Sequence, residues 1–266
     1  MHRFFLPPEH FVQHQVTFPP PQARQIRQVL RLSPGQRVVA LDDLGWAYEL
    51  ELVEVSPSAV HAWVVRKFPA PGEPRTHLTM LVCLSQREKF EWILQKCTEV
   101  GVSAFVPVLS ARSLVRSASQ VENKLERWHS ILREAAEQCG RGRIPVLHSP
   151  LSVVDAMQIV DPGGCPPNLK LMAWEAEPSV SLTHALQKCD PDKPQHVHIL
   201  IGPEGGFTPE EASLAQNMGY HIISLGSRIM RMETAAIVSA AITLSYFNDY
   251  EPGGGQSGLV DSICSP

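Results

Sequence analysis

The sequence lacks several patterns that would fix its class at once. Six cysteines are scattered over 266 residues and no C-x-x-C pair occurs, a pattern that argues against both a zinc ribbon and a disulfide scaffold. No run of about 18 apolar residues is present, so no membrane span is expected. The N-terminal Met1–Pro8 stretch contains no apolar signal-peptide core. We therefore expect reduced thiols, a cytoplasmic location and no bound metal.

An excess of positive charge is also missing. Lys and Arg total 23 against 27 Asp and Glu, which gives a formal net charge of −4. This balance excludes a protein that binds polyanions through bulk charge, although a local basic face remains compatible with it. Hydrophobic residues make up 44% of the chain, enough for a globular core and too many for a disordered protein.

One pair of histidines invites a metal interpretation. His196 and His198 alternate along an apolar run and would lie on one face of a strand, but no third ligand is near them in the sequence. Since a metal site needs at least three ligands in most cases, we expect these histidines to be satisfied or exposed.

The first part of the chain predicts short strands, and the segments that carry this prediction are 37–41, 46–55 and 59–65, preceded by a helix over 23–32. Closely spaced short strands are typical of a small β-barrel or sandwich. The segment 67–75 then holds three prolines and a glycine, and indicates a stiff linker. We place a first domain at 1–72, a second at 73–248 and a disordered tail at 249–266.

The second part alternates strands and helices. Strands are expected over 77–84, 104–109 (broken at Pro107), 169–174, 196–201 and 221–225, and helices over 88–100, 120–139, 181–188, 210–218 and 233–247. This alternation predicts an α/β domain with a parallel sheet covered by helices on both faces.

Two loops at strand ends are candidates for a binding site, because ligands of such sheets bind at the carboxyl ends of strands. The first, 201–211, reads Ile-Gly-Pro-Glu-Gly-Gly-Phe-Thr-Pro-Glu-Glu, with Thr208 as helix cap and Glu211 completing a capping box. Its glycines allow a ligand close to the backbone, although a tight strand-to-helix turn is the alternative. Neither G-x-G-x-x-G nor a P-loop is present, and Glu204 would suit a cationic or hydroxyl-bearing ligand better than phosphate.

The second loop, 225–236, reads Leu-Gly-Ser-Arg-Ile-Met-Arg-Met-Glu-Thr-Ala-Ala and leads into an alanine-rich helix. Alanines allow another helix to pack closely, and an ordinary buried helix with a charged entry is the alternative.

Together with the segments 91–102 and 127–141, these two loops resemble the bacterial ribosomal RNA small-subunit methyltransferase E family, which belongs to the knotted SPOUT methyltransferases. The resemblance covers roughly residues 1–248. Ser227 and Met232 depart from it, since proline and threonine usually stand there.

The resemblance implies a small PUA-like β-barrel that binds RNA, followed by a SPOUT α/β domain with a C-terminal trefoil knot, a rare exception to unthreaded topology. It implies methyl transfer from S-adenosylmethionine to N3 of a uridine in 16S rRNA, free or within the small ribosomal subunit, by a homodimer that pairs through the knotted region. The cofactor-binding residues that it implies are Met172, Ala173, Leu200, Gly202, Pro203, Glu204, Gly205, Leu225, Gly226, Ile229, Met230, Arg231, Thr234 and Ala235.

Uridine N3 must lose a proton to attack a methyl group, so a base, or a cation that stabilises the anionic ring, would help. Arg231 is the first candidate cation. Arg3 is the second, because an interface shared by two subunits would bring it near the partner's cofactor. Glu204 is a weaker candidate base. A salt bridge to Glu233 is the alternative role for Arg231.

Contact with RNA requires local positive charge. Candidate RNA-binding residues, expected to face one groove, are Arg3, Lys89, Lys96, Arg112, Arg133, Arg141 and Arg143. An ion pair with Glu137 is the alternative for Arg133.

Two other functions stay open: a SPOUT methyltransferase with another RNA target, and a non-catalytic ribosomal RNA-binding assembly factor. A hydrolase or a dehydrogenase is not expected, since G-x-S-x-G and the dinucleotide fingerprint are missing.

Overall fold

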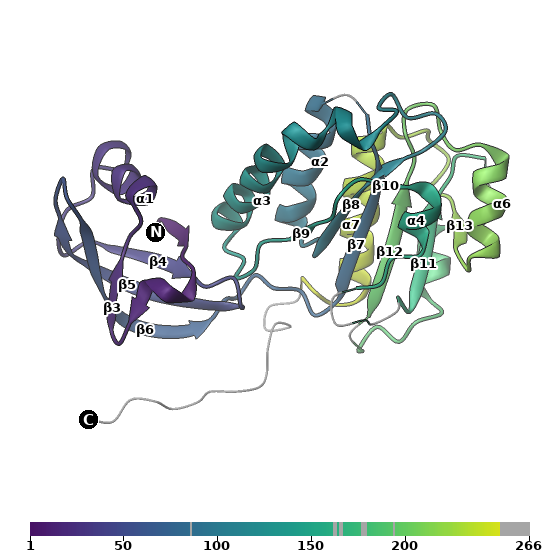
Figure 1. Cartoon of the computed structure of the whole chain (residues 1–266). Coiled ribbons are helices and arrows are strands. Elements are labelled where there is room, and N and C mark those ends of the chain that lie inside the picture. The colour runs from purple at the N-terminus through teal and green to yellow at the C-terminus, as the bar shows by residue number, and fades with distance from the viewer. Residues whose placement is uncertain (86, 162–163, 165–166, 177–179, 194, 251–266) are drawn as a thin grey trace. The chain divides into compact units, whose positions relative to one another are not determined.

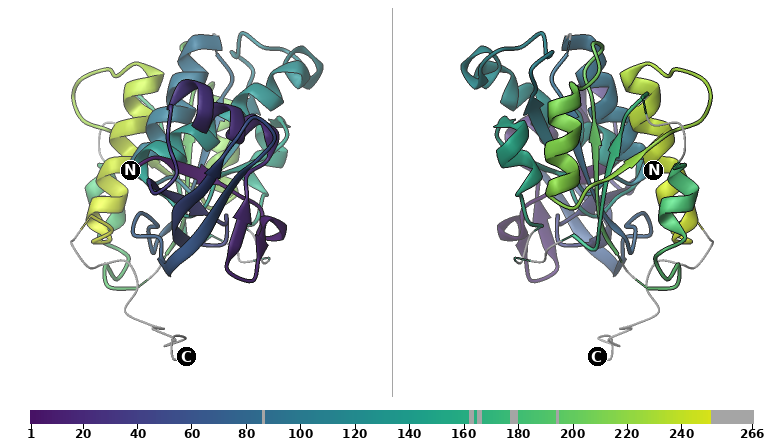
Figure 2. Two further views of the ribbon diagram at one scale, coloured as in Figure 1. Left: turned by 90° about the vertical axis from the view of Figure 1, so that its left-hand side faces the viewer. Right: turned by 90° about the vertical axis from the view of Figure 1, so that its right-hand side faces the viewer.

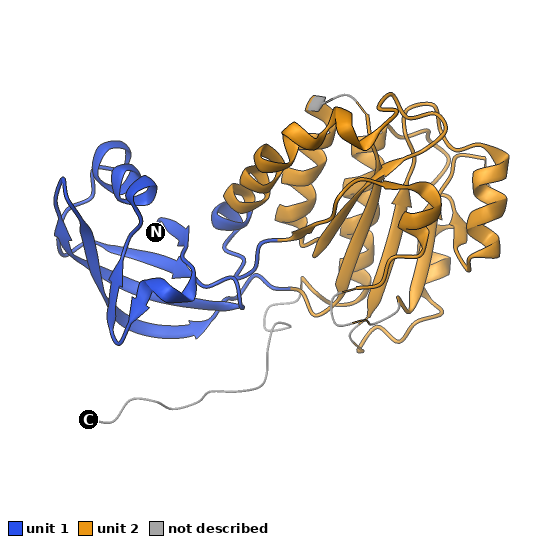
Figure 3. Ribbon diagram, in the orientation of Figure 1, with its two compact units in different colours: residues 1–73, 136–144 blue, residues 74–135, 145–266 orange. Residues whose placement is uncertain are grey.

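The structure is a computed structural model that describes residues 1–85, 87–161, 164, 167–176, 180–193 and 195–250. It divides into two compact units (Figure 3): unit 1 comprises Met1–Glu73 and Ala136–Ile144, and unit 2 comprises Pro74–Ala135 and Pro145–Pro266. The first division falls within the proline-rich segment. Most of the tail expected at 249–266 lies outside the described residues, but Asp249 is held in place, since its carboxylate accepts a 2.7 Å hydrogen bond from the Arg75 N–H.

Unit 1 contains one mixed sheet in the order β1-β4-β5-β6-β3-β2 (Figure 1), in which β1 and β4 are parallel and the other neighbours antiparallel. Its strands are β1 (Arg3–Phe5), β2 (Phe11–Val12), β3 (Gln15–Thr17), β4 (Arg37–Leu41), β5 (Trp46–Val55) and β6 (Val60–Pro69). β4 and β5 have the expected bounds, whereas β6 continues to Pro69, so the start of the expected linker is strand.

One regular helix over 23–32 was expected between β3 and β4, and this is wrong. The chain instead forms a short α-helix, α1 (Pro20–Arg24), that passes into a wider π-helical turn, η2 (Gln25–Val29). Ile26 in this turn is fully buried among the sheet residues Phe4, Val38 and Leu50. The buried Ile26 side chain thus fixes the 20–29 segment on the sheet, and the remaining side chains of the segment are at least partly exposed.

The segment Ala136–Ile144 completes unit 1. The Phe5 N–H donates a 2.9 Å hydrogen bond to Glu137, and Arg141 is 3% exposed and forms a 3.2 Å ion pair with Glu73. At Gly142 a Cβ atom would lie 2.9 Å from the Cα atom of Gly45, so only glycine fits. Sequence patterns gave no sign that this segment belongs with the first unit.

Unit 2 contains a parallel sheet in the order β10-β8-β7-β12-β11-β13, with β9 also paired to β8. Its strands are β7 (His77–Cys83), β8 (Ala104–Leu109), β9 (Val146–Leu147), β10 (Leu151–Ser152), β11 (Leu169–Ala173), β12 (His196–Ile201) and β13 (His221–Ile223). A parallel sheet of this kind confirms the expected α/β class.

Helices lie on both faces of this sheet (Figure 2). They are α2 (Arg87–Val100), α3 (Leu125–Cys139), α4 (Val153–Met157), α5 (Leu182–Leu186), α6 (Pro209–Asn217) and α7 (Met232–Tyr246). α4 and α6 pack with Leu81, Met172 and Leu200 in one core cluster, and α7 packs against β7, β12 and α2 on the other face. Alternate residues of each strand therefore face alternate helix layers, as the nearly continuous apolar strands require.

Pro107 does not break β8, contrary to expectation. On one side β8 pairs along its length with β7, and on the other it pairs with β9 at Ala104 and Phe105 and with β10 at Val108 and Leu109. Pro107 stands opposite the interval between β9 and β10, where its missing N–H breaks no ladder hydrogen bond.

Candidate functional site

Three neighbouring strands of unit 2 end at the same edge of the sheet. Ala173 of β11 is in register with Ile201 of β12 and with Ile223 of β13. Because the strands are parallel, the segments that follow them leave the sheet side by side: 174–176 after β11, 202–208 after β12 and 224–231 after β13. The two loops singled out by sequence thus meet a third strand end.

These segments, with the start of α7 and Lys89 of α2, enclose a cavity of about 720 Å³, a size typical of small-molecule sites. Its wall is made of Lys89, Ala173, Trp174, Glu175, Ile201, Gly202, Pro203, Glu204, Gly206, Ser224, Leu225, Gly226, Ser227, Arg228, Ile229, Met230, Arg231, Met232 and Ala235. Apolar side chains, loop backbone and a few charged groups therefore face one space.

Two glycines of the first loop have little space for a side chain. A Cβ atom at Gly202 would lie 2.9 Å from the Phe207 ring, and one at Gly206, whose φ is +66°, would overlap the Glu175 carboxylate. The Gly206 N–H donates to the Pro203 carbonyl at 2.9 Å, which closes the turn. Glycine is therefore favoured at both positions, and the missing side chains leave the loop backbone accessible to a ligand.

The capping box predicted at the end of this loop is confirmed. Thr208 Oγ1 accepts a 3.2 Å hydrogen bond from the Glu211 N–H, and Glu211 accepts a 2.9 Å hydrogen bond from the Thr208 N–H. Arg112 also holds the loop, since its guanidinium donates to the Gly205 carbonyl at 2.9 Å. The loop is therefore positioned from both ends before any ligand arrives.

The charged side chains in the wall include one ion pair and two unpaired arginines. Lys89 and Glu204 form a 2.9 Å ion pair, and both side chains are about a third exposed. The side chains of Arg228 and Arg231 form no ion pair or hydrogen bond with any residue that the structure describes. In particular, the alternative salt bridge between Arg231 and Glu233 is not formed. The Arg231 guanidinium is thus available to a ligand in the cavity.

Most of the expected cofactor residues lie in this wall: Ala173, Gly202, Pro203, Glu204, Leu225, Gly226, Ile229, Met230, Arg231 and Ala235. Met172 and Leu200 do not, because they face the core on the α4–α6 side. Gly205 lies against Arg112. Thr234 directly precedes the wall residue Ala235 in the sequence, but its side chain is exposed on α7. Ser227 and Met232, which depart from the resemblance, both line the cavity.

Sequence reasoning missed Trp174 and Glu175 as wall residues. Both directly follow β11, so the rule that ligands bind at strand ends, applied to that strand too, could have found them. Lys89 was expected to contact RNA, and no local signal in α2 indicates that it reaches a loop more than a hundred positions away.

The other expected RNA-binding residues divide between the units. In unit 2, Lys96 is paired with Glu99 at 2.9 Å, while Arg133 is exposed and has no partner among the described residues, so its alternative pair with Glu137 is not formed. In unit 1, Arg3 donates to the Gln138 carbonyl at 3.1 Å and Arg143 to the Leu44 carbonyl at 2.7 Å. Their common groove stays a prediction.

Arg141 requires a correction. Its guanidinium is buried and paired with Glu73, so the side chain holds unit 1 together and does not reach solvent, where a phosphate would be. The Arg-Gly-Arg sequence that suggested RNA contact is explained by this ion pair, by the close approach of Gly142 to Gly45 and by the Arg143 hydrogen bond.

At the opposite, amino ends of the strands lies a polar cluster around Asp161, which is 3% exposed. Its carboxylate accepts hydrogen bonds from Thr79 at 2.7 Å and from His196 and His198 at 2.9 Å each. Each histidine thus has a partner for one ring nitrogen, as expected, but Nδ1 of His198 is buried without a hydrogen-bond partner among the described residues. Burial alone would raise the pKa of Asp161, but these hydrogen bonds outweigh burial and hold it well below the usual value.

No group of three or more His, Cys, Asp and Glu side chains among the described residues is arranged to hold a metal ion. Cys83, Cys97, Cys139 and Cys189 form no disulfide with any described residue, and burial raises the pKa of Cys83 to about 12, which leaves it protonated and unreactive. Cys165 and Cys264 lie outside the described residues. Within the same residues, no helix is both long and apolar enough to cross a membrane.

Comparison with known proteins points to one family. A family model described as an RNA methyltransferase domain matches residues 72–244. A ribosomal RNA small subunit methyltransferase E from Synechocystis is 32% identical over 90% of this chain and 76% of the relative. The protein of the same name from Bacillus subtilis is 30% identical over 85% of this chain and 87% of the relative.

Solved structures are similar along almost the whole chain. A ribosomal RNA small subunit methyltransferase E from Neisseria gonorrhoeae, bound to S-adenosyl methionine, superposes with a TM-score of 0.78 at 26% identity, over 92% of this chain and 97% of that one. A putative methyltransferase from Legionella pneumophila, in complex with the cofactor SAM, superposes with a TM-score of 0.79 at 25% identity, over 91% and 96%.

Proposed function

The chain belongs to the ribosomal RNA small subunit methyltransferase E family, and from this premise we propose that it transfers a methyl group from S-adenosylmethionine to N3 of a uridine in 16S rRNA. The observation that carries the proposal is the meeting of the 202–208 and 224–231 loops around one cavity. Those loops hold the motifs on which the family resemblance rests, and the fold brings them together from separate strands.

The cavity suits the cofactor. Leu225 and Ile229 offer apolar walls for an adenine ring, and the loop backbone offers hydrogen bonds to its edge. The Glu175 and Glu204 carboxylates suit ribose hydroxyls and cationic groups. When bound, S-adenosylmethionine supplies a methyl group activated by its sulfonium.

The residues of the chain must position the uracil and manage its proton. Arg231, one of the two unpaired cations in the wall, would stabilise the negative charge that develops on the uracil carbonyl oxygens as N3 loses its proton. Glu204, held by Lys89, is the proposed acceptor of that proton. Ile229, which is 90% exposed, would pack against the base and exclude water.

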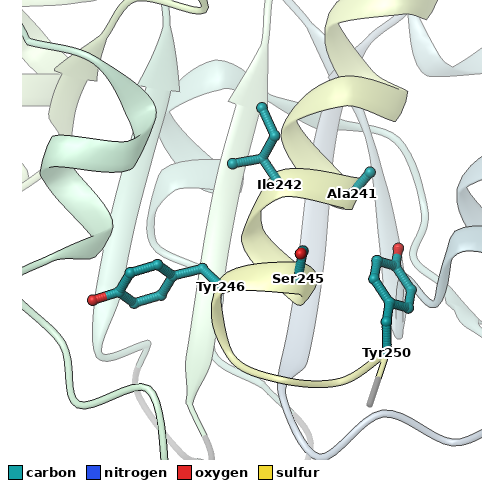
Figure 4. Close-up of a pocket in the computed structure, with 5 residues that line it drawn as sticks. All are labelled: Ala241, Ile242, Ser245, Tyr246 and Tyr250. Atoms are coloured by element: carbon teal, nitrogen blue, oxygen red, sulfur yellow. The ribbon is translucent and has the colours of Figure 1, made fainter. Parts of the chain in front are cut away.

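We also propose a homodimer that pairs through α7. This helix presents an exposed hollow of about 520 Å³ lined by Ala241, Ile242, Ser245, Tyr246 and Tyr250 (Figure 4). Ile242 is 37% and Tyr250 51% exposed, and a second copy would bury them. In such a dimer Arg3 of one chain would reach the cofactor of the other, and sedimentation of Ile242→Glu against the wild type tests the pairing.

Three further features follow from the resemblance and are proposed with it. Unit 1 is a PUA-like barrel, supported by its short, mostly antiparallel strands. The α7 segment forms a trefoil knot, supported by its return from the edge strand β13 to the middle strands β7 and β12. The protein acts in the cytoplasm, where ribosomal RNA is modified.

The decisive experiment maps N3-methyluridine in 16S rRNA from cells with and without this gene. We expect one modified position to disappear and to return with the wild-type gene. An unchanged map, together with methylation of another RNA by the purified protein, would establish a different RNA target. Failure to bind S-adenosylmethionine in calorimetry would establish the non-catalytic assembly factor instead.

A further inference from the structure

Unit 1 contains two kinds of arginine. Five have partners within the unit: Arg3, Arg37, Arg66, Arg141 and Arg143 bind carboxylates or main-chain carbonyls. The three others, Arg24, Arg27 and Arg31, form no hydrogen bond, ion pair or ring contact with any described residue. All three come from α1, η2 and the residues directly after them.

These three arginines, which we call the arginine stripe, are spaced at i, i+3 and i+7. Arg24 is the last residue of α1, Arg27 lies within η2, and Arg31 follows η2 by two residues. Between the first two, Ile26 is fully buried in the core of the sheet. Arg24 and Arg31 are exposed and Arg27 is partly exposed, so the buried isoleucine directs the stripe toward solvent.

The neighbouring sequence offers no carboxylate to neutralise this charge. Between His10 and Leu41 the sequence contains no Asp or Glu, although acidic residues outnumber basic ones in the whole chain. Three adjacent unpaired guanidinium groups repel one another, and a solvated surface in an acidic protein would ordinarily intersperse carboxylates among them. The stripe is therefore a local positive face that the fold of unit 1 leaves unbalanced.

The chemistry of the stripe fits phosphates better than a protein surface. Protein interfaces usually have an apolar or aromatic centre. The exposed residues between these arginines are Gln25, Gln28 and one valine, Val29, while Ile26 is buried and Leu30 partly buried. Guanidinium groups bind phosphate oxygens through two parallel hydrogen bonds, and glutamine amides add further donors.

We propose that the arginine stripe binds the phosphate backbone of the substrate RNA, and so fixes the position of unit 1 on it. This inference rests on the proposed function, since it takes RNA as the substrate. The contact is independent of base sequence and serves affinity and orientation, while the cavity in unit 2 selects the uridine.

The test compares two variants of equal charge in the full-length protein. Arg24→Gln/Arg27→Gln removes two charges from the stripe, and Lys188→Gln/Lys193→Gln removes two from exposed positions of unit 2. Arg31 is left intact because its φ is 53°, and a substitution there would change the backbone strain as well as the charge. Binding to in vitro transcribed 16S rRNA is measured over a range of salt concentrations.

We expect the stripe variant to bind RNA about tenfold more weakly and the slope of log affinity against log salt to fall by about 1.5, since each phosphate contact contributes roughly 0.7 to 0.9. The lysine variant should match the wild type, and Arg24→Lys/Arg27→Lys should retain most of the salt slope. KM for RNA should rise in the stripe variant while kcat and S-adenosylmethionine binding stay unchanged.

Equal losses in the two charge-matched variants would overturn the inference, because bulk charge would then explain them. Wild-type affinity in the stripe variant would overturn it too, as would a matching loss of binding to polyglutamate, which would mark a general site for acidic polymers. Failure of the wild type to methylate RNA would instead count against the proposed function, since RNA binding is measured independently.

Discussion

The two edges of the parallel sheet in unit 2 differ in how their polar groups are used. At the amino ends of the strands β12 begins with His196 and His198, and each donates one hydrogen bond to the buried Asp161. At the other edge the same strand runs into a glycine-rich loop, and Arg231 faces a cavity without any described partner. The Asp161 carboxylate thus has a closed set of donors from the protein, which stabilises the fold, whereas the Arg231 guanidinium is available to a ligand.

The largest expected effect is at the cavity edge. Arg231→Ala should lower methyl transfer by about 10² to 10³-fold, the usual cost of removing one preorganised group that stabilises developing charge. The free energy of unfolding should stay within about 0.5 kcal/mol, because an exposed side chain without partners is lost. Single-turnover methyl transfer and urea denaturation check the two parts, and Lys193→Ala is the control. Normal turnover would remove Arg231 from the mechanism.

The second effect is at the Asp161 edge, where stability and not activity should change. Asp161→Ala leaves Thr79 and His198 buried without their acceptor and should cost about 3 kcal/mol or more of unfolding free energy. Asp190→Ala, which removes a largely exposed carboxylate paired with Lys193, should cost less than about 1 kcal/mol. Thermal and urea unfolding measure both, and similar losses would contradict the closed-set interpretation.

A third comparison uses two glycines with a positive φ. Gly206, at +66°, lies against Glu175, whereas Gly219, at +83°, has nothing within 4 Å of a Cβ position. Alanine at either should cost about 1 kcal/mol of stability through the backbone. Only Gly206→Ala should also weaken S-adenosylmethionine binding, by about tenfold, since it displaces the loop that lines the cavity. Calorimetric titration of both variants shows whether the loop geometry matters for the ligand.

The smallest effect is a dependence of stability on pH. The folded-state pKa of Asp161 lies below its unfolded-state value, so the carboxylate stabilises the protein above about pH 4, and this contribution is lost as the pH falls further. Urea unfolding across that range should show a steeper loss in the wild type than in Asp161→Ala. Parallel curves would mean that the hydrogen bonds to Asp161 do not set its pKa.

Much of this arrangement could be predicted from local patterns. Periodicity placed β4, β5 and β12 at their observed bounds, and the Thr208–Glu211 capping box was read from spacing alone. The meeting of the loops could be expected because carboxyl ends of parallel strands share an edge. These features depend on residues close in sequence or on a general rule of parallel sheets.

Other features depend on distant partners, so no local pattern indicated them. Pro107 is tolerated only because β9 and β10 leave an interval beside it. Arg141 looked like a surface cation because its partner, Glu73, is 68 positions away. The ion pair of Lys89 could not be expected from a local pattern either, since Glu204 is 115 positions away, and its contact with RNA stays a prediction.

The membership of Ala136–Ile144 in unit 1 affects how the protein is made. The chain leaves unit 1 after Glu73, returns at Ala136 and leaves again after Ile144. During synthesis the N-terminal unit therefore cannot be completed when its own strands emerge from the ribosome. It must wait until a good part of unit 2 has been translated, with the Phe5 N–H and the Glu73 carboxylate still without their partners. A fragment truncated at the linker would lack Ala136–Ile144, so unit 1 has to be expressed together with unit 2.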